Sequence, residues 1–257
     1  MTASVLEVTH DGGVAAIRIN RPPANAVNPA LIREFLTVLP PLAADRDVRC
    51  IVITGTGRFF IAGADIAVMR DLSAANQAEM RRWIDVQRLL ELAPKPVIAA
   101  MNGHALGGGA ELSLACDLRI LSSNASFGFP EIALGLFPGA GGSQRLPRLV
   151  GPHMAKRIMI EGERLSARAA LELGLVDQVA DESEFAAVVT AQARRLEAKP
   201  TAAIGLLKRV IDEGFGLPVE EALLSEEKGV RELTGTADAA EGLQAFLDKR
   251  TATFTGR

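Results

Sequence analysis

The sequence contains few of the residues typical of metal sites, and nothing in it resembles a membrane span. Among its 257 residues are three histidines, two cysteines, one tryptophan and no tyrosine. No stretch approaches the roughly 18 apolar residues that a membrane-spanning helix requires. The net charge is only −3, which gives no general attraction to nucleic acid or to an anionic membrane surface. We therefore expect a soluble, cytoplasmic protein that binds neither.

The two cysteines and the first residues support the same expectation. Cys50 and Cys116 each lie among apolar residues. Because free cysteine is one of the most buried residue types, we expect both to be buried free thiols. Residues 1–4 lack the basic region and apolar run of a secretory signal, so no such signal is expected.

The common catalytic motifs are missing as well. The run Gly107-Gly108-Gly109 does not fit Gly-x-Gly-x-x-Gly, because Leu112 stands where the last glycine belongs. The sequence has no Gly-Lys-Ser/Thr phosphate loop, no His-Glu-x-x-His, no Cys-x-x-Cys and no Gly-x-Ser-x-Gly. The histidines are scattered, at His10, His104 and His153. Neither a metal site nor a Ser-His triad is expected.

The first half of the chain alternates between strand-like and helix-like segments. Residues 5–20 alternate on both sides of Asp11-Gly12-Gly13, which predicts a β-hairpin. Continuous apolar runs, which are typical of strands buried on both faces, occupy residues 49–54 and 96–101, with shorter strands at 118–121 and around Phe127. Helical spacing covers residues 29–43 and 74–92. This alternation predicts an α/β fold with largely parallel strand pairing.

From about Gly141 onward the pattern is predominantly helical. Predicted helices cover residues 166–174, 200–212, 218–233 and 238–249. This C-terminal third presents several apolar faces, which could pack on a partner subunit.

Two glycine-containing loops, residues 60–66 and 102–112, follow the two buried strands. Ligands bind at the carboxyl ends of strands in open α/β folds, and small residues let a ligand approach the backbone. The second loop runs into a helix, whose first N–H groups can bind an anion or an oxyanion. One N–H from each loop could therefore stabilise a thioester enolate. The alternative is that both loops are tight turns that allow close packing.

Two carboxylates lie in unusually apolar surroundings. Glu111 enters an apolar helix, and Glu131 is the only ionisable residue in the nine from Phe127 to Gly135. Desolvation should raise the pKa of such a carboxyl group, as acid–base catalysis near neutral pH requires. The alternative for each is a helix cap or a surface glutamate. That alternative is favoured for Glu79, Glu91 and Glu172, which we place on polar helix faces.

The two loops, the Gly-Gly-Gly-Ala-Glu segment and the run from Phe127 to Leu146 resemble the enoyl-CoA hydratase/isomerase (crotonase) family. The similarity extends from Asn20-Arg21-Pro22 to the closing segment Gly242 to Arg250. The resemblance implies an α/β spiral of ββα turns, at about residues 1–197, and a C-terminal helical trimerisation region at 198–257. It also implies a homotrimer, commonly paired into a homohexamer, and an acyl-CoA thioester as substrate with no separate cofactor.

The resemblance also implies roles for individual residues. Ala64 and Gly108 would donate the oxyanion-hole N–H groups. Glu111 would act chiefly as base toward the attacking water, Glu131 would exchange the proton at the α carbon, and Gly139 would line the water position. CoA would contact Ala62, Asp65 and Ile66 on one side and Pro23 and Ala24 on the other, with Phe246 and Lys249 near the nucleotide end. Two intact glutamates favour an enoyl-CoA hydratase.

The chain departs from the family pattern at two positions. Ala67 replaces a frequent lysine, which would weaken a CoA phosphate contact, and Phe129 replaces a frequently polar residue, which would reshape the acyl pocket. Trp83 and Phe137 could line that pocket, although a plain core role is favoured for both. The preferred acyl chain length stays open.

Other functions remain as alternatives at this stage. An isomerase would use Glu131 as its main base and add no water. A carnitinyl-type dehydratase and a thioester hydrolase could use the same frame, because one fold hosts several chemistries. Some relatives bind RNA, but the chain lacks a basic stripe with aromatic residues. A catalytically inactive scaffold is disfavoured by the two glutamates.

Overall fold

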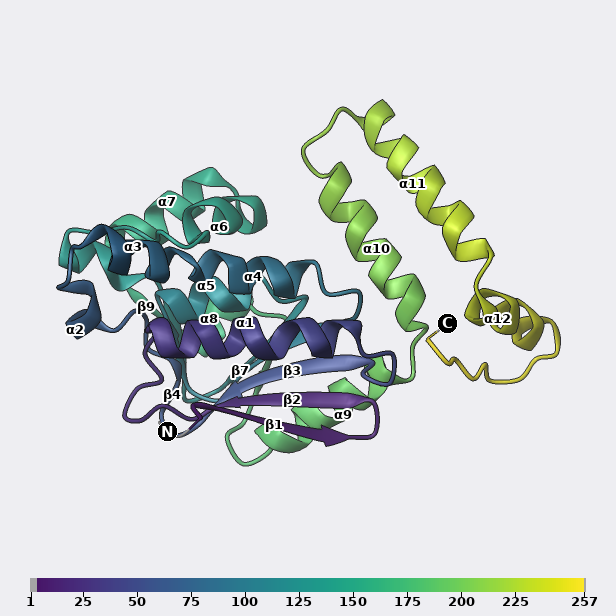
Figure 1. Ribbon diagram of the computed structural model, residues 1–257, viewed down its shortest axis with the longest axis horizontal. Helices are drawn as coiled ribbons and strands as arrows, with labels where there is room; N and C mark the ends of the chain where they lie inside the picture. Colours follow the sequence, from purple (N-terminus) through teal and green to yellow (C-terminus); the bar gives the residue numbers. More distant parts are fainter. Residues whose placement is uncertain (1–3, 257) are drawn as a thin grey trace.

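The computed structural model describes residues 4–256, and these form two sheets wrapped by helices (Figure 1). Residues 1–3 of the segment in which no secretory signal was expected lie outside the described residues. The larger sheet has the strand order β1 (Leu6–Asp11), β2 (Val14–Ile19), β3 (Cys50–Gly55), β5 (Val97–Met101), β7 (Leu118–Ser122) and β10 (Gln178–Ala180). The smaller sheet has the order β4 (Phe59–Ile61), β6 (His104–Leu106), β8 (Ser126–Gly128) and β9 (Arg164–Ser166).

The two sheets arise from a repeated turn of the chain. A long strand of the first sheet is followed by a short strand of the second sheet and then by a helical segment, three times in succession. Equivalent strands of successive turns pair in parallel, whereas the initial pair β1–β2 and the final pair β8–β9 are antiparallel. This is the spiral of ββα turns that the resemblance implied, and the predicted α/β class is confirmed.

Helices connect the strands and cover the sheets. Those before residue 165 are α1 (Pro29–Ala44), α2 (Ile66–Met69), α3 (Ala74–Arg81), α4 (Trp83–Glu91), α5 (Gly108–Leu114), the 3-10 helix η1 (Pro130–Leu134), α6 (Gly142–Val150) and α7 (Pro152–Glu161). Those after it are α8 (Ala167–Glu172), α9 (Phe185–Glu197), α10 (Thr201–Gly214), α11 (Val219–Thr234) and α12 (Ala237–Leu247).

The apolar runs of the central strands are explained by burial on both faces of the larger sheet. Ile51 and Ile53 of β3 belong to the main core, together with Phe35 of α1. Val52 of the same strand belongs to a second cluster with Phe185 of α9. Side chains of a strand alternate between its two faces, so a strand covered on both faces must be apolar throughout. Cys50 and Cys116 are buried free thiols, as predicted.

The structure corrects several predicted elements. The single helix expected over residues 74–92 is two helices, with a break at Arg82. The break lets α4 bury Trp83, Val86 and Leu90, whereas α3 buries none of its residues. The strands β4, β6, β9 and β10 were not predicted, because three residues seldom show a period of two, although the equally short β8 was predicted around Phe127.

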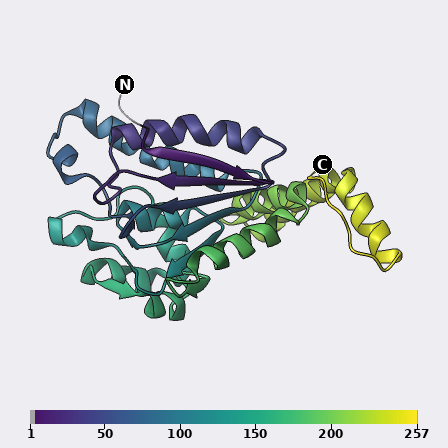
Figure 2. The same cartoon turned by 90° about the horizontal axis from the view of Figure 1, so that it is seen from below.

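The last three helices extend away from the spiral, on the side opposite α2 and α3 (Figures 1 and 2). They leave large apolar side chains in solvent, including Leu223, Leu224, Leu243, Phe246 and Leu247. Helix α9 ends at Glu197, next to the predicted boundary, although the division into residues 1–197 and 198–257 stays a prediction. Within residues 4–256, no helix combines the length and the apolar character needed to cross a bilayer.

Candidate active site

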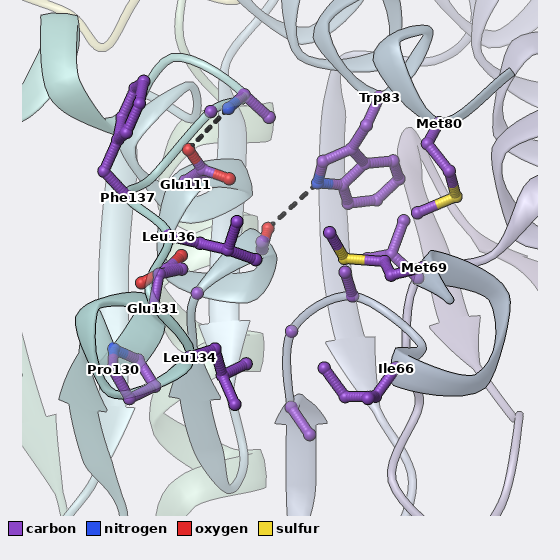
Figure 3. Close-up of a pocket in the computed structure, with 18 of the residues that line it drawn as sticks. Ile66, Met69, Met80, Trp83, Glu111, Pro130, Glu131, Leu134, Leu136 and Phe137 are labelled. Atoms are coloured by element: carbon purple, nitrogen blue, oxygen red, sulfur yellow. Dashed lines mark hydrogen bonds between the residues drawn. The ribbon is translucent and has the colours of Figure 1, made fainter. Parts of the chain in front are cut away.

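A cavity of about 500 Å³ opens between the loops that follow β4 and β6 and the segment around η1 (Figure 3). In open α/β sheets, ligands bind at the carboxyl ends of the strands, and both glycine loops reach the cavity from there. Seven of the residues predicted for the site line it: Ala62, Ala64, Ile66, Gly108, Glu111, Glu131 and Gly139. Both predicted carboxylates and both predicted N–H donors therefore border one cavity.

The backbone N–H groups of Ala64 and Gly108 are available to a ligand. Ala64 pairs with Val27 in a short parallel bridge, where Val27 N donates to Gly63 O and Asp65 N donates to Val27 O, both at 2.8 Å. In parallel pairing the middle residue directs its own N–H to the other side. Gly108 is the first residue of α5, so its N–H lies outside the helical hydrogen-bond ladder. Within residues 4–256, neither group donates to a protein acceptor.

Two glycines make this backbone geometry possible. Gly107 precedes α5 with φ +51°, a left-handed conformation that strains any residue with a β carbon. A β carbon on Gly109 would lie 2.4 Å from Ile61 O, so only glycine lets β4 approach the start of α5. The alternative reading of tight turns with close packing is also correct here, since the same glycines do both.

Glu111 is buried, with 3% of its surface exposed. Its Oε1 accepts hydrogen bonds from Ala140 N at 2.8 Å and from Gly142 N at 3.0 Å. Gly142 begins α6, so the carboxylate also lies at the positive end of a helix. Burial raises the pKa of Glu111, as predicted, while the two N–H groups and the charge of Arg145 oppose the rise.

Arg145 lies on α6 behind Glu111, and no sequence argument singled it out. Its Nε donates to Glu91 Oε1 at 2.5 Å, and its Nη1 donates to Gln87 Oε1 at 2.6 Å and to Ala140 O at 3.3 Å. Glu91 was placed on a polar helix face; its side chain is 21% exposed and pairs with Arg145. The one signal in the sequence was an arginine three residues beyond the glycine run that ends at Gly142.

Glu131 has a different environment. It lies in η1, and Figure 3 shows its carboxyl group near that of Glu111 in the cavity. Its Oε2 is buried and has no hydrogen-bond partner among the described residues. Burial raises the pKa of Glu131 to about 7; its own backbone N–H lowers the value, and the charge of Glu111 raises it further. A carboxyl group with this pKa can give or take a proton near neutral pH.

The rest of the cavity wall is largely apolar, with Met69, Met80, Trp83, Leu134, Leu136 and Phe137 (Figure 3). Trp83 belongs to the core, as predicted, but its Nε1 also donates to Gly108 O at 3.1 Å at the cavity wall. Phe137 is not a core residue: 72% of its surface is exposed, and its ring borders the cavity. Such a wall accepts an apolar chain.

The other predicted contact residues lie farther out. Ala24 O accepts from Ala62 N at 3.1 Å, which holds the segment of Pro23 and Ala24 beside the first loop. Asp65 accepts from Arg21 at 2.6 Å and caps α2. Phe246, in α12, is 82% exposed, and neither it nor Lys249 borders the cavity. A single chain does not bring these last two residues to the site.

Two free N–H groups beside two carboxyl groups in an apolar cavity define a class of enzyme, one that moves protons next to a polarised carbonyl group. Comparison with known proteins narrows the class. The model of the enoyl-CoA hydratase/isomerase family matches residues 9–257, and the chain belongs to this family.

Individual relatives agree with this assignment. The crotonyl-CoA hydratase of Syntrophomonas wolfei is 42% identical over 247 residues, which cover 95% of each chain. The short-chain-enoyl-CoA hydratase of Clostridium acetobutylicum is 41% identical and covers 93% of each chain. The crystal structure of an enoyl-CoA hydratase from Bacillus anthracis superimposes with a TM-score of 0.94 at 36% identity, over 98% of this chain and 100% of that one. The predicted family and the predicted hydratase function are confirmed at this level.

Proposed function

We propose that the chain is an enoyl-CoA hydratase that reversibly adds water to a 2-trans-enoyl-CoA and gives a 3-hydroxyacyl-CoA. The observation that carries the proposal is the pair of glutamates, which share one cavity but differ in what surrounds each carboxyl group. The names of the relatives support the same reaction.

The first part of the mechanism is polarisation of the thioester. In the proposed complex, the carbonyl oxygen accepts hydrogen bonds from Ala64 N–H and Gly108 N–H. Addition of water at the β carbon moves electrons onto this oxygen, so the negative charge develops where two fixed dipoles already point. Removing one such donor costs other enzymes about 3–4 kcal/mol of transition-state stabilisation.

The second part is the movement of two protons. Ionised Glu111 takes a proton from the water as its oxygen bonds to the β carbon, and the C=C electrons pass to the thioester oxygen. The enolate then collapses, and the α carbon takes the proton of Glu131. Gly139 borders the cavity without a side chain, which leaves room for the water. After product release, one proton passes from Glu111 to solvent and one from solvent to Glu131, which restores the starting state. The reaction then balances with water and the two glutamates, so the proposal includes no metal or redox cofactor.

The third part is binding of CoA. We propose that Ala62, Asp65 and Ile66 contact one side of the pantetheine and adenine, and Pro23 and Ala24 the other. Phe246 and Lys249 would reach the nucleotide end from a neighbouring copy, because α12 lies far from the cavity of its own chain (Figure 1). A homotrimer or homohexamer in the cytoplasm is the assembly we propose, and the exposed apolar residues of α10–α12 support it.

The test is hydration of crotonyl-CoA, followed by loss of the conjugated enoyl-thioester absorbance and by the mass of the product. We expect a 3-hydroxyacyl thioester from the wild type and little from Glu111→Ala or Glu131→Ala. Glu172→Ala is the matched control, because Glu172 is exposed and pairs with Arg168 on its own helix. A double-bond shift without a hydroxyacyl product would replace the hydratase by an isomerase.

A further inference from the structure

Arg145 anchors the segment that holds Glu111. Its guanidinium donates to Ala140 O at 3.3 Å, and the N–H of the same Ala140 donates to Glu111 Oε1 at 2.8 Å. Arg145 N also donates to Gly141 O at 2.8 Å. The arginine thus contacts both residues that precede Gly142, the second donor to Glu111.

Close packing leaves this arrangement little freedom. A β carbon on Gly141 would lie 1.8 Å from Arg145 Nη1, and one on Gly142 would lie 3.0 Å from Glu111 Oε1. Gly141 has φ +103°, which glycine adopts without strain. On its far side, the guanidinium is held by Gln87, which is fully buried, and by Glu91. Arg145 is therefore fixed between the Ala140–Gly142 loop and α4.

The charges around Glu111 can be traced through each neighbouring element. Helix α6 contributes Arg145, and η1 contributes Glu131. Behind Arg145, α4 contributes Glu91, which also pairs with exposed Arg88 at 3.3 Å. Strand β4 carries no charged residue, and His104 of β6 forms a hydrogen bond with Ser126. Arg145 is the only cation with a resolved effect on Glu111, and Glu91 is its only ion-pair partner among the described residues.

We propose that Arg145 and Glu91 are positioning residues that together set how readily Glu111 ionises. Arg145 holds the Ala140–Gly142 loop on Glu111 and favours the carboxylate by its charge, while Glu91 holds Arg145 and partly offsets that charge. The inference rests on the proposed role of Glu111 as base. Neither residue touches the cavity, so both act through the loop and through charge.

The two members of the pair should shift the ionisation of Glu111 in opposite directions. Arg145→Gln removes the cation, so the pKa of Glu111 should rise, because a nearby opposite charge favours the carboxylate. Glu91→Gln keeps an oxygen that can accept from Arg145 but removes the offsetting charge, so the pKa of Glu111 should fall. Arg145→Lys keeps the charge but not the planar set of donors of the guanidinium. In this variant the pKa of Glu111 should stay close to its wild-type value while kcat drops.

Two measurements test this on the full chain. Selective ¹³C labelling of glutamate carboxyl carbons follows the titration of Glu111 by NMR, with Glu111→Gln used to assign its signal. The pH dependence of kcat/KM for crotonyl-CoA gives the acid limb, which should move up in Arg145→Gln and down in Glu91→Gln. Arg148→Gln is the matched control, because Arg148 is an exposed cation of the same helix and its side chain donates to Gln144 O.

The outcomes are distinct. Opposite shifts in the two variants, with Arg148→Gln unchanged, support the proposal. Lower activity with no shift of either titration would overturn it and leave a purely structural role for Arg145. Because the NMR titration needs no turnover, a wild type that fails to hydrate crotonyl-CoA would refute the proposed function without deciding whether Arg145 and Glu91 control Glu111.

Discussion

Glu111 and Glu131 border one cavity, but the protein around them differs. Glu111 is the more deeply buried, yet two N–H groups, a helix N-terminus and an arginine favour its charged form. Glu131 has a buried oxygen that has no hydrogen-bond partner among the described residues, and burial raises its pKa to about 7. Burial raises the pKa of both carboxyl groups. At Glu111 two backbone N–H groups and the charge of Arg145 oppose the rise, whereas at Glu131 the charge of Glu111 adds to it and only its own backbone N–H opposes it.

The largest expected effect comes from removing either carboxyl group. Glu111→Gln and Glu131→Gln should each lower kcat for hydration by about 10²–10⁴-fold, the usual contribution of a general acid or base. The two variants should differ in exchange of the α protons of butyryl-CoA with D₂O, measured by mass, because only Glu131 is assigned to the α carbon. Glu111→Gln should retain exchange and Glu131→Gln should lose it; loss in both variants would erase the distinction between the two residues.

The next effect comes from the loop that holds Glu111. In Gly142→Ala, the new β carbon would lie 2.9 Å from Pro138 Cβ and 3.0 Å from Glu111 Cγ, so the carboxylate must move. Displacement of a catalytic group by about 1 Å can cost on the order of 10²-fold in rate, and we expect a loss of kcat approaching this size. Gly216→Ala is the control, because its β carbon would meet no atom within 4 Å. Equal rates in the two variants would contradict the described contact.

The pH dependence of kcat/KM should report the ionisation of both Glu111 and Glu131. In the proposed mechanism, the hydration-competent enzyme carries one proton on the pair, with Glu131 protonated and Glu111 ionised. Activity should fall about tenfold per pH unit above about 7, as Glu131 loses its proton, and should fall at low pH as Glu111 gains one. An isomerase with ionised Glu131 as base would instead gain activity as the pH rises through 7.

The smallest effect concerns stability. The folded-state pKa of Glu131 lies above that of the unfolded chain, so folded protein binds the proton more tightly. Its contribution to the free energy of unfolding therefore declines as the pH rises from about 4.5 through about 7. The glutamine of Glu131→Gln cannot ionise. The free energy of unfolding of this variant should therefore exceed that of the wild type by about 1–2 kcal/mol at pH 8 but not at pH 4. Urea unfolding at both pH values checks this, and an equal difference at both would contradict it.

The sequence predicted most of the fold and the two carboxylates. The apolar runs at β3 and β5 identified strands buried on both faces, and the glycines after them identified the loops. Glu111 and Glu131 stood out because each was the only ionisable group in an apolar segment, and their raised pKa values confirm that inference. Local composition sufficed here, since desolvation of these side chains follows from their immediate neighbours.

Features that depend on distant contacts were missed or wrongly assigned. Arg145 and Glu91 are 54 residues apart in sequence, and helical spacing shows which face of α4 is polar but not which helix covers it. A core role was favoured for Phe137 over a place in the pocket wall, yet the loop after η1 exposes it and it borders the cavity. The contribution of Phe246 and Lys249 stays a prediction, because a single chain leaves both far from the cavity.

The sequence by itself determined which segments become buried strands, where the backbone can approach a ligand, and which carboxyl groups lose water. These properties depend on residues near one another in the chain. Only the tertiary structure decided that the two glutamates meet in one cavity, that Arg145 stands behind Glu111, and that different groups therefore act on the pKa of each carboxyl group. Charge–charge and hydrogen-bond effects act through space over a few ångströms, and the folded chain alone sets those distances.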